Sequence, residues 1–255
     1  WDVLEKPESD DTLICSRLED AKYAARHHQT RFLGFLDKRQ QVILVKRLDS
    51  RETRGISACF WGGYPDAERQ ILGVFPANRP SDGTQFPIGA IHAVWKGKSL
   101  SHRDFLGALL SLGIRREKIG DILVRAEDAI FLLENEISLF VFSNLRRVSN
   151  MPVSCEIFTD KEIVREDHFE EITGTIASAR LDCMVSALTG SSRAQAEKQI
   201  ISGLVSVNWI PVTDGSIQLS PETVLSIRGC GRFRLDSVGP QTKKGRLRFL
   251  ARKSL

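Results

Sequence analysis

The apolar residues of this 255-residue chain occur in short runs, and this limits the fold more than any other feature of the sequence. The longest runs, Ala129 to Leu133 and Ile137 to Phe142, are far below the roughly 18 residues that a membrane-spanning helix needs. A content of 42% hydrophobic and 27% charged residues is typical of a globular protein with a core. At roughly 100 to 200 residues per domain, the length predicts one large domain or two to three small ones. We therefore expect a globular protein without a membrane span.

The cysteines and histidines are scattered and predict neither a disulfide framework nor a metal site. The cysteines form no CxxC pair, which is typical of a reducing compartment: Cys15, Cys59, Cys155, Cys183 and Cys230. We predict no bound metal and no cofactor. The chain begins with Trp1 instead of Met, and we expect an upstream segment, with a targeting peptide as one alternative.

The positive charge lies at one end of the chain. Residues from Ala177 onward include 12 Lys or Arg and five acidic residues, a net charge of +7. The first 176 residues include 24 Lys or Arg and 27 acidic residues, a net charge of −3. Clustered cations gain affinity for phosphates by releasing condensed counterions. The asymmetry favours a polyanionic partner, with a solvated basic tail as the alternative.

Periodicity in the N-terminal part predicts helices first and strands later. A helical pattern extends from Leu13 to Phe35, with a break near Thr30. The next run, 41–48, fits a helix or a strand. Three runs rich in β-favouring residues are separated by Gly and Pro, and they predict strands of one sheet: Ile56–Trp61, Ile71–Phe75 and Ile88–Trp95.

The middle of the chain alternates helices and strands, which indicates the α+β class. Ser101 and Asp104 fit a capping box at the start of a helix over 101–112, and Gly113 fits its end. Strands are predicted at 119–124, 129–133 and 153–158, and a helix from Asn135 to about Leu145. The charged segment 159–172 lacks periodicity, and we interpret it as a link to the basic module.

The basic module is predicted to contain a helix hairpin followed by a small antiparallel sheet. Ser178 fits a cap for a helix over 179–188 that ends at Gly190. Ser191 or Ser192 fits the start of a second helix over 193–202, which Gly203 ends. Strands follow at 204–209, 224–227 and 233–235, with turns at 213–215 and 229–231.

The helix pair offers a predicted anion groove. Helix N-termini present free amides and a partial positive charge, so amides, Ser hydroxyls and guanidinium groups can bind a phosphate backbone together. Asp182 suits the role of orienting an arginine better than that of touching phosphate. The residues that we assign to this groove are Arg180, Asp182, Ser192, Arg193 and Lys198.

Two further basic segments extend the predicted RNA surface. The segment 228–234 places arginines on a turn with two glycines beside Phe233, which we expect to fill the core. The segment 242–248 adds four charges, and the combination favours structured RNA, where phosphate contacts and shape dominate. The residues assigned here are Arg228, Gly229, Gly231, Arg232, Lys243, Lys244, Arg246 and Arg248.

Sequence signatures of enzymes are incomplete, and we predict no catalytic residue. His102-Arg-Asp104 is like a kinase catalytic loop, but Leu109 stands where a metal-binding Asn is required. Gly62-Gly63 has no Walker lysine nearby. Arg180-Leu-Asp182 is similar to the aspartate motif of pseudouridine synthases, although here it opens a small helix pair.

Several motifs of the basic module resemble the RNA-binding domain first defined in ribosomal small-subunit protein S-four. These motifs are Ala177-Ser-Ala-Arg-Leu-Asp182, Ser192-Arg193, the segment 201–209 that includes Val207-Asn208-Trp209, and Ile227-Arg-Gly-x-Gly-Arg-Phe233. Motifs along the rest of the chain resemble the bacterial YlmH family, also called RqcP: Phe35-Leu-Asp37 with Arg39-Gln-Gln41, Phe60-Trp-Gly-Gly-Tyr64 with Ala67-Glu-Arg69, His102-Arg-Asp-Phe-Leu-Gly107, the segment 112–121, and Thr242-Lys-Lys-Gly-Arg246.

The resemblance implies a fold and a role. It implies an N-terminal region with helices and the start of the α+β region (1–85), an RRM-like α/β sandwich domain (86–172) and an S-four-type domain with a basic tail (173–255). It implies that the groove and turn residues and Asn208 contact RNA. The implied partners are ribosomal RNA and tRNA of the large ribosomal subunit, and the implied role is quality control of stalled nascent chains. Phe60-Trp61 lacks the alternating aromatics of a base-stacking sheet.

We therefore expect a monomeric, non-enzymatic RNA-binding factor. Plant and cyanobacterial relatives carry the label photosystem II S-four domain protein, so we expect the chloroplast stroma, with the bacterial cytoplasm as the alternative. Two rival functions stay open at this point: an RNA-modifying enzyme of the pseudouridine-synthase type, and a protein-interaction factor in photosystem or cell-division assembly.

Overall fold

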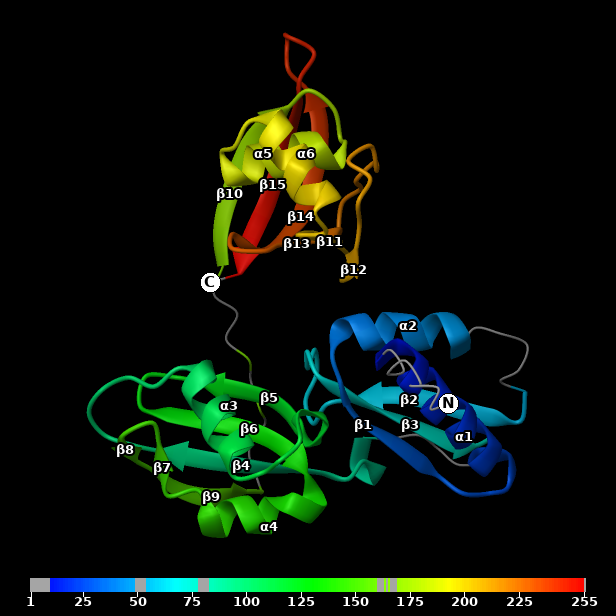
Figure 1. Ribbon diagram of the computed structural model, residues 1–255, viewed down its shortest axis with the longest axis vertical. Coiled ribbons are helices and arrows are strands. Elements are labelled where there is room, and N and C mark those ends of the chain that lie inside the picture. Colours follow the sequence, from blue (N-terminus) through cyan, green and yellow to red (C-terminus); the bar gives the residue numbers. More distant parts are fainter. Residues whose placement is uncertain are drawn as a thin grey trace, which may run out of the picture. The chain divides into compact units, whose positions relative to one another are not determined.

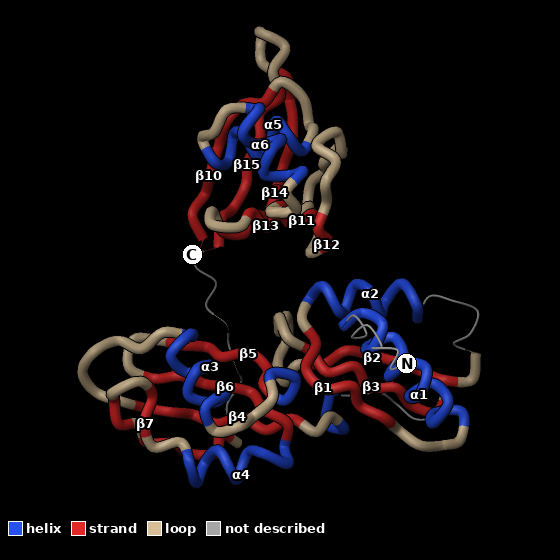
Figure 2. The backbone as a smooth tube through the Cα atoms, in the orientation of Figure 1, coloured by secondary structure: helices blue, strands red, loops and turns tan. Residues whose placement is uncertain are grey.

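The chain folds into two compact units, Trp1–Arg165 (unit 1) and Glu166–Leu255 (unit 2). The computed structural model describes residues 10–48, 54–77, 83–159, 163, 165 and 169–254 (Figure 1). No helix in these ranges is long and apolar enough to cross a membrane. Figure 2 shows that both units combine helices with sheets, and this confirms the predicted α+β class.

The N-terminal half of unit 1 is a three-stranded antiparallel sheet packed against two helices. The strand order is β1-β3-β2. Residues of α1 such as Leu18 bury against Leu72 and Val74 of the sheet in one hydrophobic cluster. The elements are α1 (Asp10–Arg26), β1 (Arg31–Leu36), α2 (Lys38–Leu48), β2 (Ile56–Trp61) and β3 (Gln70–Pro76). The undecided run 41–48 is therefore helical.

The predicted helix over 13–35 is wrong in its second part, because residues 31–36 form strand β1. The register of β1 against β3 shifts between Phe32 and Phe35, and Gly34 lies at this shift with a φ of 73°. The bulge places Leu33, Phe35 and Leu36 all in the core. A bulged strand can therefore imitate the spacing of an amphipathic helix.

The second half of unit 1 has the RRM-like topology that was predicted. The chain order is strand, helix, strand, strand, helix, strand, and the sheet order is β5-β6-β4-β9, all antiparallel. The predicted single sheet is wrong, because β2 and β3 belong to the first sheet and β4 to the second. The elements are β4 (Ile88–Val94), α3 (His102–Ser111), β5 (Ile119–Val124), β6 (Asp128–Glu134), α4 (Asn135–Asn144) and β9 (Ser154–Phe158). Shorter elements are η2 (Gly83–Gln85), η3 (Arg116–Lys118), β7 (Arg147–Val148) and β8 (Met151–Pro152).

One face of the RRM-like sheet is covered, and the other is covered in part. Ile91 and Phe131 pack against Phe105 of α3 on one face. On the other face Ile130 and Leu132, which alternate with Phe131 along β6, join a second cluster with residues of the N-terminal half: Phe35, Tyr64, Ala67, Ile71 and Phe75. An RRM uses this second face to stack bases. Here Leu132 is 1% exposed and belongs to the core, whereas Val94 at the other end of the same face is 43% exposed.

A buried polar network fastens the two halves of unit 1 to each other. The Asp121 carboxylate accepts hydrogen bonds from the Tyr64 hydroxyl (2.6 Å) and from the amides of Glu68 (2.6 Å) and Arg69 (2.9 Å). The Arg69 guanidinium donates to the carbonyls of Ile119 and Phe35. Burial lowers the pKa of Arg69 to about 10. Residues of three motifs that carry the family resemblance therefore meet at one internal joint.

Unit 2 is a helix pair packed on a six-stranded antiparallel sheet of order β10-β15-β14-β13-β11-β12. Its core includes Leu181 and Val185 of α5, Ala196 and Ile200 of α6, and Phe233. Phe233 is 2% exposed, which confirms the predicted core position. The elements are β10 (Phe169–Ile176), α5 (Leu181–Thr189), α6 (Arg193–Ile201), β11 (Val205–Val207), β12 (Ile210–Pro211), β13 (Val224–Ile227), β14 (Gly231–Gln241) and β15 (Leu247–Ser254).

Two expectations about the limits of the basic module need correction. Segment 159–172 is not a link throughout, because residues 169–172 begin β10, which pairs with β15 from Phe169↔Ser254 to Ile176↔Leu247. The predicted boundary between 172 and 173 therefore falls inside a strand. The basic tail is not a tail either, since β15 lies between β10 and β14 and buries Phe249 and Ala251. Alternation of apolar and basic residues, as in Leu247-Arg-Phe-Leu-Ala251, is a strand pattern with one buried face.

Candidate nucleic-acid interface

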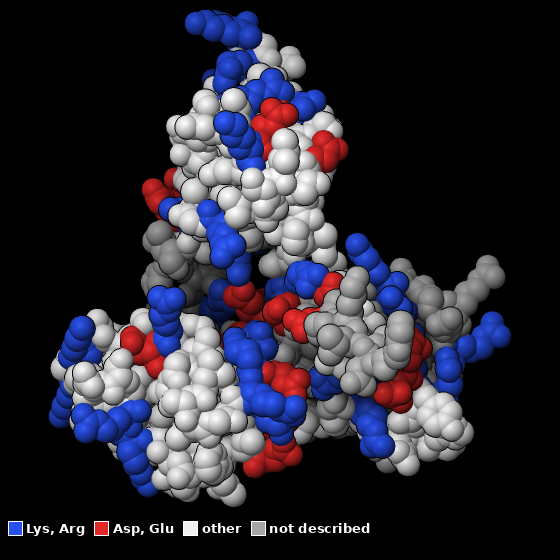
Figure 3. All heavy atoms as spheres, viewed as in Figure 1, with Lys and Arg blue, Asp and Glu red and all other residues white. Residues whose placement is uncertain are grey.

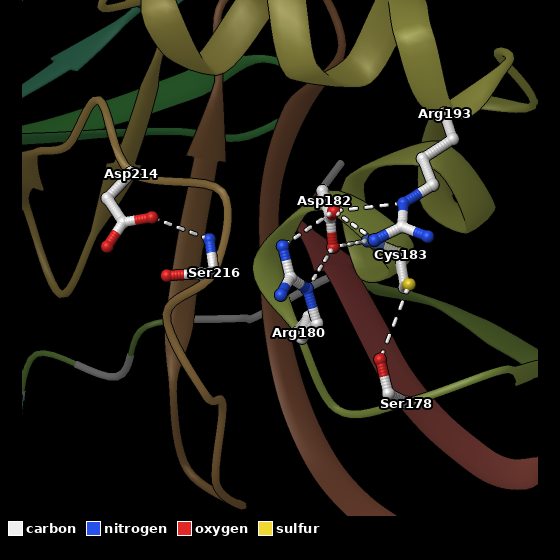
Figure 4. A network of polar contacts seen from close by, with 7 residues as sticks. All are labelled: Ser178, Arg180, Asp182, Cys183, Arg193, Asp214 and Ser216. Carbon is white, nitrogen blue, oxygen red and sulfur yellow. Dashed lines mark hydrogen bonds and ion pairs between the residues drawn. The ribbon is translucent and has the colours of Figure 1, made fainter.

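One buried carboxylate holds two arginines at the start of α5 (Figure 4). Arg193 donates from Nε (2.9 Å) and Nη2 (2.7 Å) to Asp182 Oδ2. Arg180 donates from Nε to Oδ1 and from Nη2 to Oδ2, both at 3.2 Å. The Asp182 side chain is 5% exposed, whereas the side chains of Arg180 and Arg193 are 37% and 60% exposed. The buried acid therefore presents two guanidinium groups to solvent, as predicted for its orienting role.

The surroundings of Asp182 keep it ionised. Burial of the carboxyl opposes ionisation, but hydrogen bonds from Arg180, Arg193 and the Cys183 amide outweigh it and lower the pKa of Asp182 to about 2. Both carboxylate oxygens accept from guanidinium groups. In this geometry Asp182 positions the two guanidinium groups.

The start of α5 differs from the predicted anion groove. The helix begins at Leu181 instead of Ala179, and its N-cap is Arg180, with no side-chain cap, instead of Ser178. The amides of Leu181 and Asp182 donate to the carbonyls of Ile217 and Gly215. Arg180 also forms a β-bridge with Gln218. The loop 215–219 therefore occupies the amides that were expected to bind phosphate, and guanidinium groups are the donors that remain at this end.

The start of α6 agrees with the sequence. Ser192 is the N-cap and forms a capping box with Gln195. The Ser192 hydroxyl accepts from the Gln195 amide (3.3 Å) and donates to Gln195 Oε1 (3.1 Å). Ser192 thus has a structural function in the cap, and it orients the first turn from which Arg193 projects. Lys198 lies in the last turn of α6 and is exposed.

The other predicted residues form two groups at opposite ends of β14. Arg228, Gly229, Gly231 and Arg232 lie at the turn from β13 into β14. Lys243, Lys244 and Arg246 lie in the loop from β14 to β15, and Arg248 is near the start of β15. An 11-residue strand spans roughly 30 Å or more. The structure therefore does not bring these residues into a single cluster.

Asn208 is part of a tight turn. Its φ is 46°, and its Oδ1 accepts a hydrogen bond from the Val224 amide (2.9 Å). Its own amide donates to the Val224 carbonyl (2.8 Å). The side chain that the resemblance assigned to RNA is engaged in joining β11 to β13.

The ion pairs of unit 2 separate its cations into two classes. Arg252 pairs with Asp236 (2.5 Å), and Arg234 pairs with Glu222. A second class forms no ion pair with any acidic residue that the structure describes: Lys198, Arg228, Lys243, Lys244, Arg246 and Arg248. A phosphate backbone can use the charge of this second class in full. It can also reach the Nη1 donors of Arg193, which the pairing with Asp182 leaves unused.

The net charge of the folded unit is lower than the sequence division suggested. Residues 166–255 include 12 basic and nine acidic residues, a net charge of +3, because β10 brings in acids such as Glu170 and Glu171. Glu171 lies opposite Arg252 at the far end of β15 from the 242–246 loop. The acids of β10 are therefore at one end of unit 2, beside Arg252, and the unpaired lysines of the loop are at the other.

Sequence reasoning missed several residues that build this surface. Thr175 accepts from Arg246 through its hydroxyl (3.1 Å) and its carbonyl (2.7 Å), and so fixes the base of the 242–246 loop. Gly215 packs so closely on Asp182 that a Cβ there would lie 3.2 Å from the Asp182 Cβ. The pairing of β10 with β15 brings Thr175 to Arg246, and this contact spans 71 residues with no local signal in the sequence.

Comparison with known proteins agrees with this architecture. Residues 84–162 match the family model YlmH_RBD, a candidate RNA-binding domain in YlmH, and residues 180–225 match the S4 domain. A protein of Bacillus subtilis (strain 168) named "Ribosome-associated protein quality control protein P2" is 31% identical over 239 residues, which are 92% of this chain and 91% of that protein. The solved structure "Cell division protein ylmH from Streptococcus pneumoniae" aligns with a TM-score of 0.51 at 18% identity, covering 62% of this chain and 96% of its own, and shows a shared fold.

The first match covers the RRM-like half of unit 1, and the second covers the helix pair, β11, β12 and the start of β13 in unit 2. The Bacillus relative extends the similarity over nearly the full length of both proteins. The chain therefore belongs to the YlmH family.

Proposed function

We propose that this protein is a non-enzymatic RNA-binding factor of the large ribosomal subunit, which contacts ribosomal RNA and tRNA during quality control of stalled nascent chains. The single observation that carries the proposal is the pair of exposed guanidinium groups held by buried Asp182, on the domain that matches S4. The name of the Bacillus relative supports the ribosomal setting.

The geometry supports phosphate binding by unit 2. Arg193 uses Nε and Nη2 for Asp182, so its Nη1 group still has donors for an anion. Arg180 and Arg193 are already oriented, which reduces the rotamer entropy lost on binding. Unpaired Lys198, Lys243 and Lys244 add charge without a competing acid. Phosphate contacts therefore dominate this interface, and the affinity depends on salt.

A salt titration of RNA binding tests the site. With about five phosphate contacts, the logarithm of the affinity should fall with that of the salt concentration at a slope of about −4. Replacing Arg193 and Arg228 by Gln should weaken binding about 30-fold at about 0.1 M salt and reduce the slope by about 2. The matched control is the double variant Arg31→Gln and Lys46→Gln, two exposed cations of unit 1. Equal affinities of the two variants would contradict this site.

Sedimentation with ribosomal subunits tests the ribosomal partner. We expect the protein to pellet with large subunits and to pellet more strongly when they carry peptidyl-tRNA, because tRNA supplies additional phosphates. Binding to small subunits alone would contradict the proposal. Expression in Bacillus cells that lack the relative should restore ribosome-associated quality control.

We propose the chloroplast stroma as the location. The support is the resemblance of the sequence motifs to the plant and cyanobacterial branch. Imaging of a fluorescent fusion of the complete gene product in leaf cells tests this location, and a cytosolic signal would contradict it.

A further inference from the structure

A second group of cations lies at the end of unit 1 where β7 and β8 are located. Segments 95–103 and 145–153 together contain five Lys or Arg and no acidic residue. Figure 3 shows basic side chains gathered at this end of the RRM-like half. All five side chains are exposed, and we call them the end patch: Lys96, Lys98, Arg103, Arg146 and Arg147.

Hydrogen bonds hold the two segments of the end patch together. Ser149 Oγ in one segment donates to Asp104 Oδ1 (3.0 Å), which adjoins the other. Asp104 is itself committed to the capping box of α3, where it accepts from the Ser101 amide and hydroxyl. The carbonyl of Lys98 accepts from Trp95 Nε1 (3.2 Å). The backbone that carries the cations is therefore fixed before any partner binds.

The end patch forms no ion pair with an acidic residue in the described ranges. Arg17 with Glu117 and Lys118 with Glu136 are paired on the same unit. Arg147 donates to the Asn150 carbonyl (3.1 Å), which leaves its charge without a neutralising acid. The end patch thus presents a positive field to solvent.

The chemistry of the end patch favours a phosphodiester backbone over a membrane or over unpaired bases. Among the large apolar side chains of its two segments, Trp95 is 4% exposed, Val148 is not exposed and Met151 is partly buried. A peripheral membrane site needs exposed apolar side chains that enter the lipid, and a base-reading site needs exposed aromatics for stacking. The sheet face that could stack bases is partly covered by the N-terminal half of unit 1, and its open part places Asp128 and Glu156 against His92.

We propose that the end patch is a second RNA-binding site of this protein, which contacts the sugar-phosphate backbone of structured RNA without reading its sequence. The inference rests on the proposed function in taking RNA as the partner. It assigns to unit 1 a contact that is separate from the arginines and lysines of unit 2. Because both sites are on one chain, binding at one raises the effective concentration at the other.

Charge-neutralised full-length variants test the proposal. The patch variant replaces Lys98, Arg103 and Arg146 by Gln. The matched control replaces three exposed cations of the N-terminal half, Arg31→Gln, Lys46→Gln and Arg54→Gln, so both proteins lose the same charge. The probe is a labelled RNA duplex of mixed sequence, measured by fluorescence anisotropy over a range of salt concentrations. We expect the patch variant to bind about 100-fold more weakly than the control at about 0.1 M salt, with a slope reduced by about 2 to 3.

The unit 2 variant with Arg193→Gln and Arg228→Gln separates failure of this inference from failure of the proposed function. If the patch variant binds like its control while the unit 2 variant binds weakly, the end patch is refuted and the unit 2 site stands. If the patch variant alone is weakened, the end patch stands and the unit 2 site is refuted. Circular dichroism and thermal unfolding should give the same curves for patch and control variants, because all six positions are exposed.

Two further experiments test the chemical class of the partner. Duplexes of two unrelated sequences should lose affinity by the same factor in the patch variant, and a loss confined to one sequence would contradict backbone contact. Vesicles of phosphatidylglycerol should bind the wild type and the patch variant equally. Binding to vesicles that depends on the end patch, without a change in RNA affinity, would overturn the proposal in favour of a membrane surface.

Discussion

At Asp182 a single carboxylate accepts hydrogen bonds from two arginines and from a backbone amide. This arrangement removes part of the positive charge of unit 2, yet it fixes two guanidinium groups in one orientation. Ordering a long side chain costs about 0.5 to 1.5 kcal/mol on binding. The buried acid meets this cost during folding, and for this reason an acidic residue can increase the affinity of a cationic surface.

Replacing Asp182 by Asn should reveal this effect through the direction in which the RNA affinity changes. The variant has one more net positive charge, so unspecific attraction alone would make RNA binding tighter. We expect binding to weaken by about threefold to tenfold, because Arg180 and Arg193 lose their common partner. Fluorescence anisotropy with the same RNA duplex measures the change. Tighter binding by the variant would show that net charge, and not orientation, determines affinity.

The low pKa of Asp182 also predicts how stability depends on pH. A pKa that falls from 3.8 to about 2 on folding stabilises the folded state above about pH 4, by about 2 kcal/mol. This contribution is lost as the pH falls through the folded value. Urea unfolding at about pH 6 and at about pH 2.5 gives the free energy of unfolding at each pH. The decrease in this free energy from the higher to the lower pH should be smaller for Asp182→Asn than for wild type. Equal drops would contradict the assigned pKa.

Of the secondary-structure elements, the hairpin of β14 and β15 has the largest effect on how the basic C-terminus is interpreted. Strand β15 lies between two other strands, and its cations divide by position. Arg252 is paired with Asp236, whereas Lys243 and Lys244 of the connecting loop have no acidic partner among the described residues. Position along the hairpin, more than the number of basic residues, therefore determines which charges RNA can reach.

Two double variants test this division. Lys243→Gln with Lys244→Gln removes two unpaired charges, and Arg234→Gln with Arg252→Gln removes two paired ones. We expect the lysine variant to lose RNA affinity about 30-fold at about 0.1 M salt and the arginine variant about threefold or less. The arginine variant should instead lose thermal stability. A larger loss of RNA affinity in the arginine variant would contradict the division.

The sequence predicted elements well where local chemistry specifies them. The capping box at Ser101, the start of α6 at Ser192 and the end of α5 at Gly190 are as predicted. The predictions failed where distant partners decide. Gly34 allows a bulge that only pairing with β3 explains, and the start of α5 shifts because loop 215–219 binds its amides. The candidate site follows the same rule, since Arg193 was predicted and the packing of Gly215 on Asp182 was not.

At the scale of the whole molecule, unit 1 shows that a familiar topology need not keep its familiar surface. The RRM-like sheet has the expected strand order, but the N-terminal half covers much of the face on which bases would stack. Hydrogen bonds of Tyr64, Arg69 and Asp121 hold this half in place. The proposed contact of unit 1 with RNA is therefore at its end, where loops and helix termini are exposed.

Cutting the chain within unit 1 should therefore fail. A fragment over residues 84–162, the limits of the family match, would expose the apolar face that contains Ile130 and Leu132. We expect this fragment to aggregate, and a fragment over residues 1–165 to be monodisperse in size-exclusion chromatography. A well-folded 84–162 fragment would show that the covering half contributes little to stability.

The pairing of β10 with β15 has a practical consequence. Phe169 and Ser254 are directly opposite each other, so the chain enters and leaves unit 2 on neighbouring strands at one end (Figure 1). The loop with Lys243 and Lys244 is at the other end of the same strands. A biotin or an optical-trap handle attached after Ser254 would consequently hold unit 2 at the end that carries Glu170 and Glu171. It would leave the loop with Lys243 and Lys244 accessible for single-molecule work.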